Sequence, residues 1–182
     1  HRCDTRKAWI PVGHWRRADG AGINRDLQAD LEKLRSRAAY EAKNNGTVEG
    51  VILTHAEDIV GCDGPTLQVE SDSPAYNDAA ERAWRDWFSA PCPNPRLSGV
   101  QLLKLWIRGL WLNGEYLAQL ITSRHAAGPV SLRVKPVHPR RLATPWDRIG
   151  DPLVSMGIRF DGEGVPVQYF LTNGVRRPTA SK

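Results

Sequence analysis

The stretch from Ser98 to Thr122 constrains the fold of this chain more than any other. It reads as a capped apolar helix, a break at Asn113-Gly114, and then a strand. Ser98 and Gln101 stand three positions apart, which is the spacing of a capping box. Asn and Gly both tolerate the left-handed conformation that commonly ends a helix. The sequence therefore predicts a sharply bounded helix that leads directly into a sheet.

This helix is apolar around most of its circumference. Lys104 and Arg108 form its narrow polar stripe, and the apolar positions outside that stripe are Leu102, Leu103, Trp106, Ile107 and Leu110. A helix with so narrow a polar stripe is typical of a protein interior. We therefore expect most of it to be buried, with the rest of the chain supplying layers on both sides.

The composition fits a folded domain with a mild basic excess. The chain has 182 residues, a hydrophobic share of 41% and a formal net charge of +5. That length suits one domain, or one domain with an arm, and can bury a core without staples. The positive charge permits an acidic partner such as nucleic acid, although many proteins of other functions are equally basic.

The cysteines indicate a reducing compartment. Cys3, Cys62 and Cys92 are few, odd in number and widely separated. This pattern favours the cytosol over a secreted disulfide scaffold. No apolar run reaches the length of a membrane span, so we expect no membrane partner. Because the chain begins at His1 and stops just after a strand-like run, we expect it to be part of a longer protein.

Residues 1–23 form a predicted basic amino-terminal arm. Glycines and a proline interrupt any helical periodicity, and cationic residues surround two tryptophans. We interpret the arm as a contact for a neighbouring subunit or for nucleic acid phosphates. The alternative is an arm that packs its indoles on its own domain. The candidate contact residues are Arg6, Lys7, Trp9, Trp15, Arg16 and Arg17.

Three further helices are predicted ahead of the central one. Leu27, Leu31, Leu34 and Ala38 share one face, with Arg35 and other charged residues on the opposite face. A second helix runs from about Val48 to Gly61. After a short strand candidate, 66–70, Ser73-Pro74 starts a third helix. One face of that helix is expected to form core or a subunit interface, and carries Tyr76, Ala80, Ala83, Trp84 and Trp87.

Strands follow the central helix. We predict strands over 115–122 and 131–137, a corner at 138–145, and a final hairpin over 156–171. Helices first and strands later predict an α+β fold, with a mixed or antiparallel sheet in a domain spanning 24–182.

No catalytic motif is present in the sequence. There is no phosphate-binding G-x-x-x-x-G-K loop, and none of H-E-x-x-H, C-x-x-C or G-x-S-x-G occurs. His55 and Cys62 lie two turns apart on a helix, but no second ligand pair with metal-like spacing accompanies them. Glu115, after the helix break, is interpreted as a surface carboxylate at the start of a strand. We therefore predict no catalytic, metal-binding or cofactor-binding residues.

Several segments resemble one family in their order along the chain, from about Arg16 to Leu171. The first is the helix pair 27–61 with its Lys43-Asn44-Asn45 junction, and the second is Ala-Ala-Glu-Arg-Ala-Trp-Arg-Asp-Trp at 79–87. Leu-Asn-Gly-Glu-Tyr-Leu follows at 112–117, with Asn where the family has Asp. The segments 137–145, 157–161 and 164–169 complete the series. Together they resemble the lambda-type portal proteins of tailed bacteriophages, in their amino-terminal, wing-forming portion.

The resemblance implies a structural, non-enzymatic role. It implies a homo-oligomeric ring of about a dozen subunits at one capsid vertex, closed by heterologous interfaces. The implied partners are the terminase, the major capsid and scaffolding proteins, the head-tail connector proteins and the double-stranded DNA that passes through the channel. The implied location is the virion, with assembly in the host cytoplasm. The clip, stem helix and tunnel loop of the family match no segment here, so no DNA-channel residue is assigned.

A second interpretation remains open beside this one. The basic charge and the Arg- and Trp-rich arm also fit a nucleic-acid-binding or nucleic-acid-processing enzyme domain. That interpretation predicts DNA affinity that falls steeply with salt. It also predicts metal-dependent cleavage that is lost when one or two carboxylates are changed.

Overall fold

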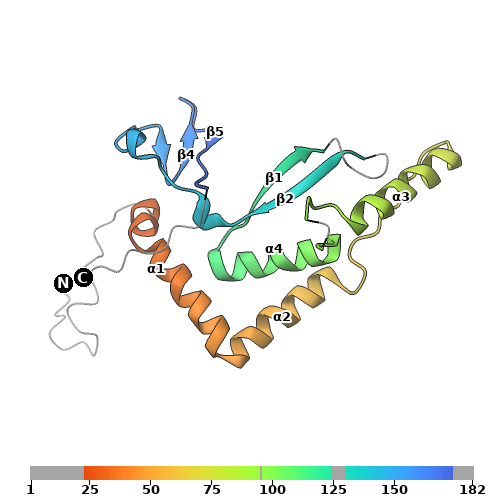
Figure 1. Ribbon diagram of the computed structural model, residues 1–182, viewed down its shortest axis with the longest axis horizontal. Coiled ribbons are helices and arrows are strands. Elements are labelled where there is room, and N and C mark those ends of the chain that lie inside the picture. Colours follow the sequence, from red (N-terminus) through yellow and green to blue (C-terminus); the bar gives the residue numbers. More distant parts are fainter. Residues whose placement is uncertain (1–22, 95, 124–129, 174–182) are drawn as a thin grey trace, which may run out of the picture.

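The chain folds as four helices followed by two small antiparallel sheets (Figure 1). This computed structural model describes residues 23–94, 96–123 and 130–173. The α+β class predicted from the sequence is confirmed, and both sheets are antiparallel. The helices are α1 (Ile23–Asn44), α2 (Gly46–Val60), α3 (Pro74–Ser89) and α4 (Gly99–Asn113). The strands are β1 (Leu117–Thr122), β2 (Leu132–Val137), β3 (Val154–Ser155), β4 (Ile158–Phe160) and β5 (Pro166–Tyr169).

The corner between α1 and α2 follows from its local sequence. The Asn45 side chain accepts hydrogen bonds from the backbone N–H groups of Thr47 and Val48, which caps α2. α2 ends where Gly61 adopts a positive φ of 72°, a conformation that glycine reaches without strain. The predicted helix pair is confirmed, and α1 begins at Ile23, about one turn before the predicted start.

The ends of α4 are also those predicted. Ser98 and Gln101 form a complete capping box, and Gly114 takes the left-handed conformation at the carboxyl end. Its predicted burial is wrong, however. Gly99 and Leu102 are the buried residues of α4, whereas Leu105, Leu110 and Trp111 are exposed.

The polar stripe of α4 explains part of the difference between its predicted and its observed burial. Lys104 and Arg108 point towards α2, where their side-chain nitrogens lie 3.8 Å and 2.6 Å from carboxylate oxygens of Glu57 and Glu49. The β1–β2 hairpin lies along another side of α4 (Figure 1). The described residues supply two layers, and these leave part of the apolar circumference open to solvent.

The β1–β2 hairpin forms the first sheet. Leu117 pairs with Val137 and Thr122 pairs with Leu132, and Val134 and Val137 are buried. The Val134 N–H also donates to the carbonyl of Pro91 at 2.8 Å, so the loop before α4 lies beside the second edge of β2.

The second sheet has the order β3-β4-β5 and contains the predicted hairpin. Its tight turn is held by Asp161, whose side chain accepts hydrogen bonds from the N–H groups of Glu163 and Val165. Two short 3-10 helices, η3 (Pro139–Arg141) and η4 (Trp146–Arg148), connect the two sheets.

Residues 65–89 form an extended projection that we call the arm, which is distinct from the predicted amino-terminal arm, residues 1–23. The strand predicted at 66–70 is wrong, because this segment runs beside α3 and pairs with no strand among the described residues. The Val69 N–H donates to the Glu81 carboxylate, and the Trp84 indole N–H donates to the Pro65 carbonyl. α3 starts at Ser73-Pro74 as predicted, but none of its described residues is buried. Its tryptophan stripe is therefore not core.

The base of the arm depends on close packing between Phe88 and Gly99. A methyl group at Gly99 would lie 2.2 Å from a ring carbon of Phe88, far inside contact distance. We expect Gly99→Ala to lower the free energy of unfolding by about 1–3 kcal/mol, as overpacked cores do. Urea unfolding followed by circular dichroism measures the change.

Gly50→Ala in α2 is the matched control. A methyl group there meets no atom within 4 Å. We expect it to stabilise the helix by about 0.5–1 kcal/mol, because alanine loses less conformational freedom than glycine on folding. If both variants unfolded at the same urea concentration, the close packing at the arm's base would be refuted.

Candidate interaction surface

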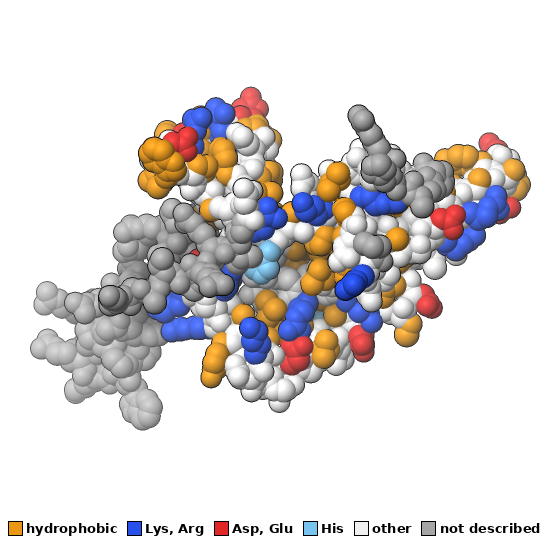
Figure 2. All heavy atoms as spheres, viewed as in Figure 1, with side chains coloured by type: hydrophobic (Ala, Val, Ile, Leu, Met, Phe, Trp, Pro, Cys, Tyr) orange, Lys and Arg blue, Asp and Glu red, His pale blue; other side chains and the backbone are white. Residues whose placement is uncertain are grey.

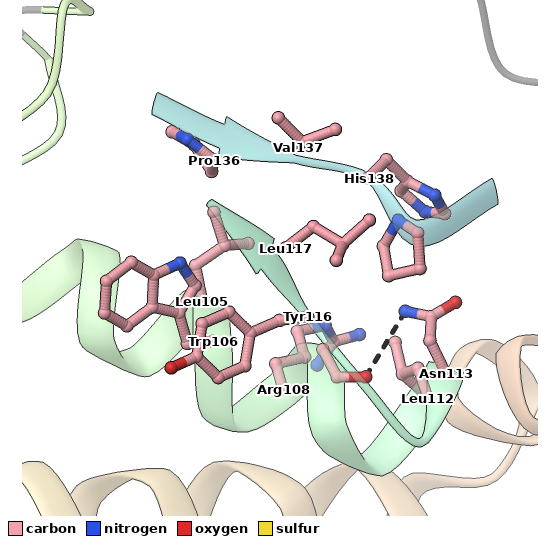
Figure 3. Close-up of a pocket in the computed structure, with 12 residues that line it drawn as sticks. Leu105, Trp106, Arg108, Leu112, Asn113, Tyr116, Leu117, Pro136, Val137 and His138 are labelled. Atoms are coloured by element: carbon pink, nitrogen blue, oxygen red, sulfur yellow. Dashed lines mark hydrogen bonds between the residues drawn. The ribbon is translucent and has the colours of Figure 1, made fainter. Parts of the chain in front are cut away.

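A groove opens between the carboxyl-terminal half of α4 and the β1–β2 hairpin (Figure 3). Its volume is about 340 Å³. Trp106 and Tyr116 lie at one end of the groove, and Asn113 and His138 lie at the other. The remaining walls are mostly aliphatic, and the lining residues that matter below are Leu105, Arg108, Leu112, Leu117, Pro136 and Val137.

A stacked aromatic pair closes one end of the groove. The rings of Trp106 and Tyr116 have centroids 4.7 Å apart and planes inclined by 14°. The same pair lines a second cavity of about 480 Å³ on the α2 side of α4, together with Ile59 and Leu110. The Trp106 indole nitrogen is shielded from solvent and has no hydrogen-bond partner among the described residues. The apolar linings of the two cavities therefore meet at Trp106 and Tyr116.

Arg35 fixes the other end of the groove. This α1 side chain is only 6% exposed, and its guanidinium contacts the corner between α4 and β1. Its Nε donates to the Asn113 carbonyl at 3.2 Å, and one terminal nitrogen forms a close ion pair with Glu115. A second carboxylate, that of Glu32, lies 3.4 Å from the other terminal nitrogen. α1 is thereby fastened to the helix-strand break.

His138 lies at this end, close to the guanidinium groups of Arg35 and Arg140. Burial lowers the pKa of His138 from its usual 6.5, and the nearby guanidinium groups of Arg140 and Arg35 lower it further. The carboxylate of Glu32 acts in the opposite direction. His138 also accepts a hydrogen bond at Nδ1 from the Arg140 backbone N–H at 3.1 Å. Both guanidinium groups are themselves paired with carboxylates, that of Arg35 with Glu115 and Glu32 and that of Arg140 with Glu32.

Large hydrophobic side chains are exposed at several further places. In the second sheet and η4, Trp146 is 85% exposed, and Ile149, Val167 and Tyr169 are exposed as well. Hydrophobic side chains gather on the outer end of this sheet (Figure 2, upper left). Contiguous exposed apolar surface of this kind marks interaction sites.

A family model for lambda-family phage portal proteins matches residues 12–181, nearly the whole chain. The chain belongs to this family. No curated protein sequence gives a significant match. The resemblance stated from the segment order is confirmed. A portal protein is a structural component of the phage particle, assembled into the capsid with other phage proteins, and the exposed apolar surface of this portal chain suits such assembly.

The six basic and aromatic residues predicted as contacts in the amino-terminal arm lie outside the described residues. They are Arg6, Lys7, Trp9, Trp15, Arg16 and Arg17. Their role stays a prediction. Within residues 23–94, 96–123 and 130–173, no helix of this portal chain is long and apolar enough to cross a membrane.

His55 and Cys62 form no metal site with other described residues. The Trp111 indole N–H donates to Nδ1 of His55 at 2.7 Å, while Cys62 is exposed. In the described part of the chain, no group of three potential ligands from His, Cys, Asp and Glu comes together. His55 therefore acts as a hydrogen-bond acceptor that orients an exposed tryptophan.

Sequence reasoning misses the Arg35 cluster. The helical pattern places Arg35 on the solvent face of α1, but it is buried, whereas Leu34 from the predicted apolar face is exposed. The same reasoning makes Glu115 an ordinary surface carboxylate, but it is the ion-pair partner of Arg35. The two residues are 80 positions apart, so neither local pattern identifies the pair.

Removing the charge of Glu115 tests this cluster. We expect Glu115→Gln to lower the free energy of unfolding by about 2 kcal/mol, because hydrogen bonds to charged groups are worth about 1.5–3 kcal/mol and Arg35 stays buried. Glu163→Gln, in the exposed turn of the second sheet, should change it by less than about 0.5 kcal/mol. Urea titration of both variants gives the comparison. Equal, small effects would mean that Arg35 does not depend on Glu115.

Proposed function

We propose that the chain is a structural, non-enzymatic subunit of a portal ring at one vertex of a phage capsid. The ring contains about a dozen identical subunits in a closed cyclic arrangement. It forms the passage for DNA during packaging and ejection, and it docks the terminase and the head-tail connector. The observation that carries this proposal is the family match over residues 12–181.

The exposed apolar surface supports ring formation. Burial of apolar area is worth about 25 cal/mol per Å², so exposed side chains such as Trp146 and Ile149 favour association. These residues lie in the connection between the two sheets, while Leu105 and Trp111 are exposed on α4. A subunit with apolar surface on separate elements can contact two neighbours through two different faces. That is the arrangement a cyclic ring needs.

The remaining roles follow from a portal position in the particle. The basic arm 1–23 contacts a neighbouring subunit or DNA through the six residues named above, and the domain 24–182 contributes to the outer wing. The major capsid and scaffolding proteins meet the ring during assembly in the host cytoplasm. In the finished virion the ring stays at the vertex.

Electron microscopy of the complete protein tests the proposal. We expect negatively stained samples at micromolar concentration to show rings with a central channel, since association buries the exposed apolar faces. Size-exclusion chromatography with light scattering gives the mass of the particle. A protein that remains monomeric at high concentration would contradict the portal function.

A further inference from the structure

The two outer edges of the β1–β2 hairpin differ in what covers them. On β2, the Val134 N–H donates to the Pro91 carbonyl at 2.8 Å, and the Leu132 carbonyl accepts a hydrogen bond from the Trp87 indole N–H at 2.7 Å. Residues 87–91, at the base of the arm, therefore cover the outer edge of β2. The outer edge of β1 has no such cover among the described residues.

The hydrogen-bonding pattern of the hairpin shows which groups of β1 point outward. The Ser123 N–H donates to the Ser131 carbonyl at 2.9 Å. Because hydrogen-bonded pairs alternate along an antiparallel ladder, every second residue from Ser123 back to Leu117 directs its backbone groups toward β2. The residues between them direct their N–H and C=O groups to the open side, where these groups bond to no described residue. They are Ala118, Leu120 and Thr122.

β1 also lacks the features that usually protect an open edge strand from pairing. Protected edges carry charged side chains, a proline or a bulge, or they are very short. β1 has six residues, Leu-Ala-Gln-Leu-Ile-Thr, without a charge or a proline, and its pairing with β2 shows no register shift. Leu120 near its centre is 68% exposed. In the second sheet, by contrast, β3 has only two residues and β5 begins at Pro166. The edge of β1 is therefore suited to accept a further strand.

The arm contains a segment with the sequence of a strand but without a strand partner among the described residues. Residues 66–70, Thr-Leu-Gln-Val-Glu, run beside α3 and form neither a helix nor a turn (Figure 1). The Val69 N–H faces α3, where it donates to the Glu81 carboxylate at 3.2 Å. Because successive N–H groups of an extended segment point to opposite sides, that of Gln68 faces away from α3. It bonds to no described residue, and Gln68 is exposed.

The open edge of β1 and the arm lie on opposite sides of the hairpin. The arm is attached on the β2 side, through the hydrogen bond from Trp87 to Leu132 and the packing of Phe88 on Gly99. Beyond this base it extends away from the body (Figure 1). The unpaired backbone groups of β1 face the other way, across β2 from the arm. Residues 66–70 can therefore reach the β1 edge of another molecule but not that of their own subunit.

We propose that residues 66–70 of one subunit add as a strand to the free edge of β1 in a second copy of this chain. The unpaired backbone groups of the two segments then bond to each other, and such main-chain bonds supply the affinity in strand addition. Two different faces of each subunit meet in this contact, so repetition generates a ring rather than an isolated pair. The inference rests on the proposed portal function and identifies two faces that its ring requires.

Removal of one N–H from the β1 edge tests the pairing in the complete protein. Leu120→Pro deletes an outward N–H that bonds to no described residue of its own subunit, and proline is tolerated at such edge positions. Leu120→Ala is the matched control, because it removes the exposed side chain but keeps the N–H. We expect Leu120→Pro to weaken ring assembly about tenfold or more and Leu120→Ala to weaken it far less. Light scattering after size-exclusion chromatography measures assembly, and circular dichroism confirms that both variants are folded.

Chemical cross-linking identifies the segment that occupies the edge. Leu120→Cys and Gln68→Cys are combined in one complete chain in which the native cysteines have been replaced. We expect a short bis-maleimide reagent to yield a ladder of covalent multimers up to ring size in denaturing gels. The control combines Leu120→Cys with Tyr40→Cys, an equally exposed site on α1 outside the arm, and should give no ladder.

Hydrogen exchange of the Leu120 amide separates this inference from the portal function itself. We expect that amide to exchange fast in dissociated subunits and slowly in rings, whereas the Ile121 amide, bonded within the hairpin, is slow in both. Rings in which the Leu120 amide stays fast, or subunits in which it is already slow, would overturn the strand addition and leave the ring standing. A protected Leu120 amide without the cross-link to Gln68 would mean that another segment occupies the edge, which also overturns it. An unaltered protein that forms no rings overturns both.

Discussion

The buried guanidinium of Arg35 is the interaction on which the arrangement of the helices depends. It joins α1 to the Asn113 carbonyl and to Glu115, so the first helix is fixed to the point where α4 turns into the sheet. A buried charge costs several kcal/mol of desolvation, and it is tolerated only with such partners. The same guanidinium lies near His138 at the end of the groove and helps to lower the pKa of that imidazole. One residue thus links the packing of the helices to the character of the interaction surface.

The elements that Arg35 holds together leave large hydrophobic side chains exposed in the isolated subunit. α4 lies between α2 and the hairpin, yet Leu105, Leu110 and Trp111 remain exposed. The arm has no buried residue in the described part of α3, and the three-stranded sheet carries exposed side chains on its outer end. Small sheets and single helices gain little stability on their own. In the proposed portal ring, neighbouring subunits cover these faces, so assembly and folding stability are coupled.

Local features of this fold could be predicted from the sequence, and long-range ones could not. The capping box at Ser98, the left-handed Gly114 and the turn at Asp161 each depend on residues within a few positions. The missed burial of Arg35 and the wrong strand at 66–70 depend on partners far along the chain. The groove was missed as well, because it forms only when β2 packs over α4. Its lining residues are spread over α4, β1, β2 and η3, so no local pattern in the sequence marks it.

Hydrogen exchange of the complete protein tests most directly whether neighbours complete this fold. Backbone amides exchange through local opening, and segments with few buried contacts open most easily. The account predicts that residues 67–78 of the arm and the carboxyl-terminal half of α4 exchange more slowly in assembled rings than in dissociated subunits. Identical exchange rates for both segments in the two states would contradict it.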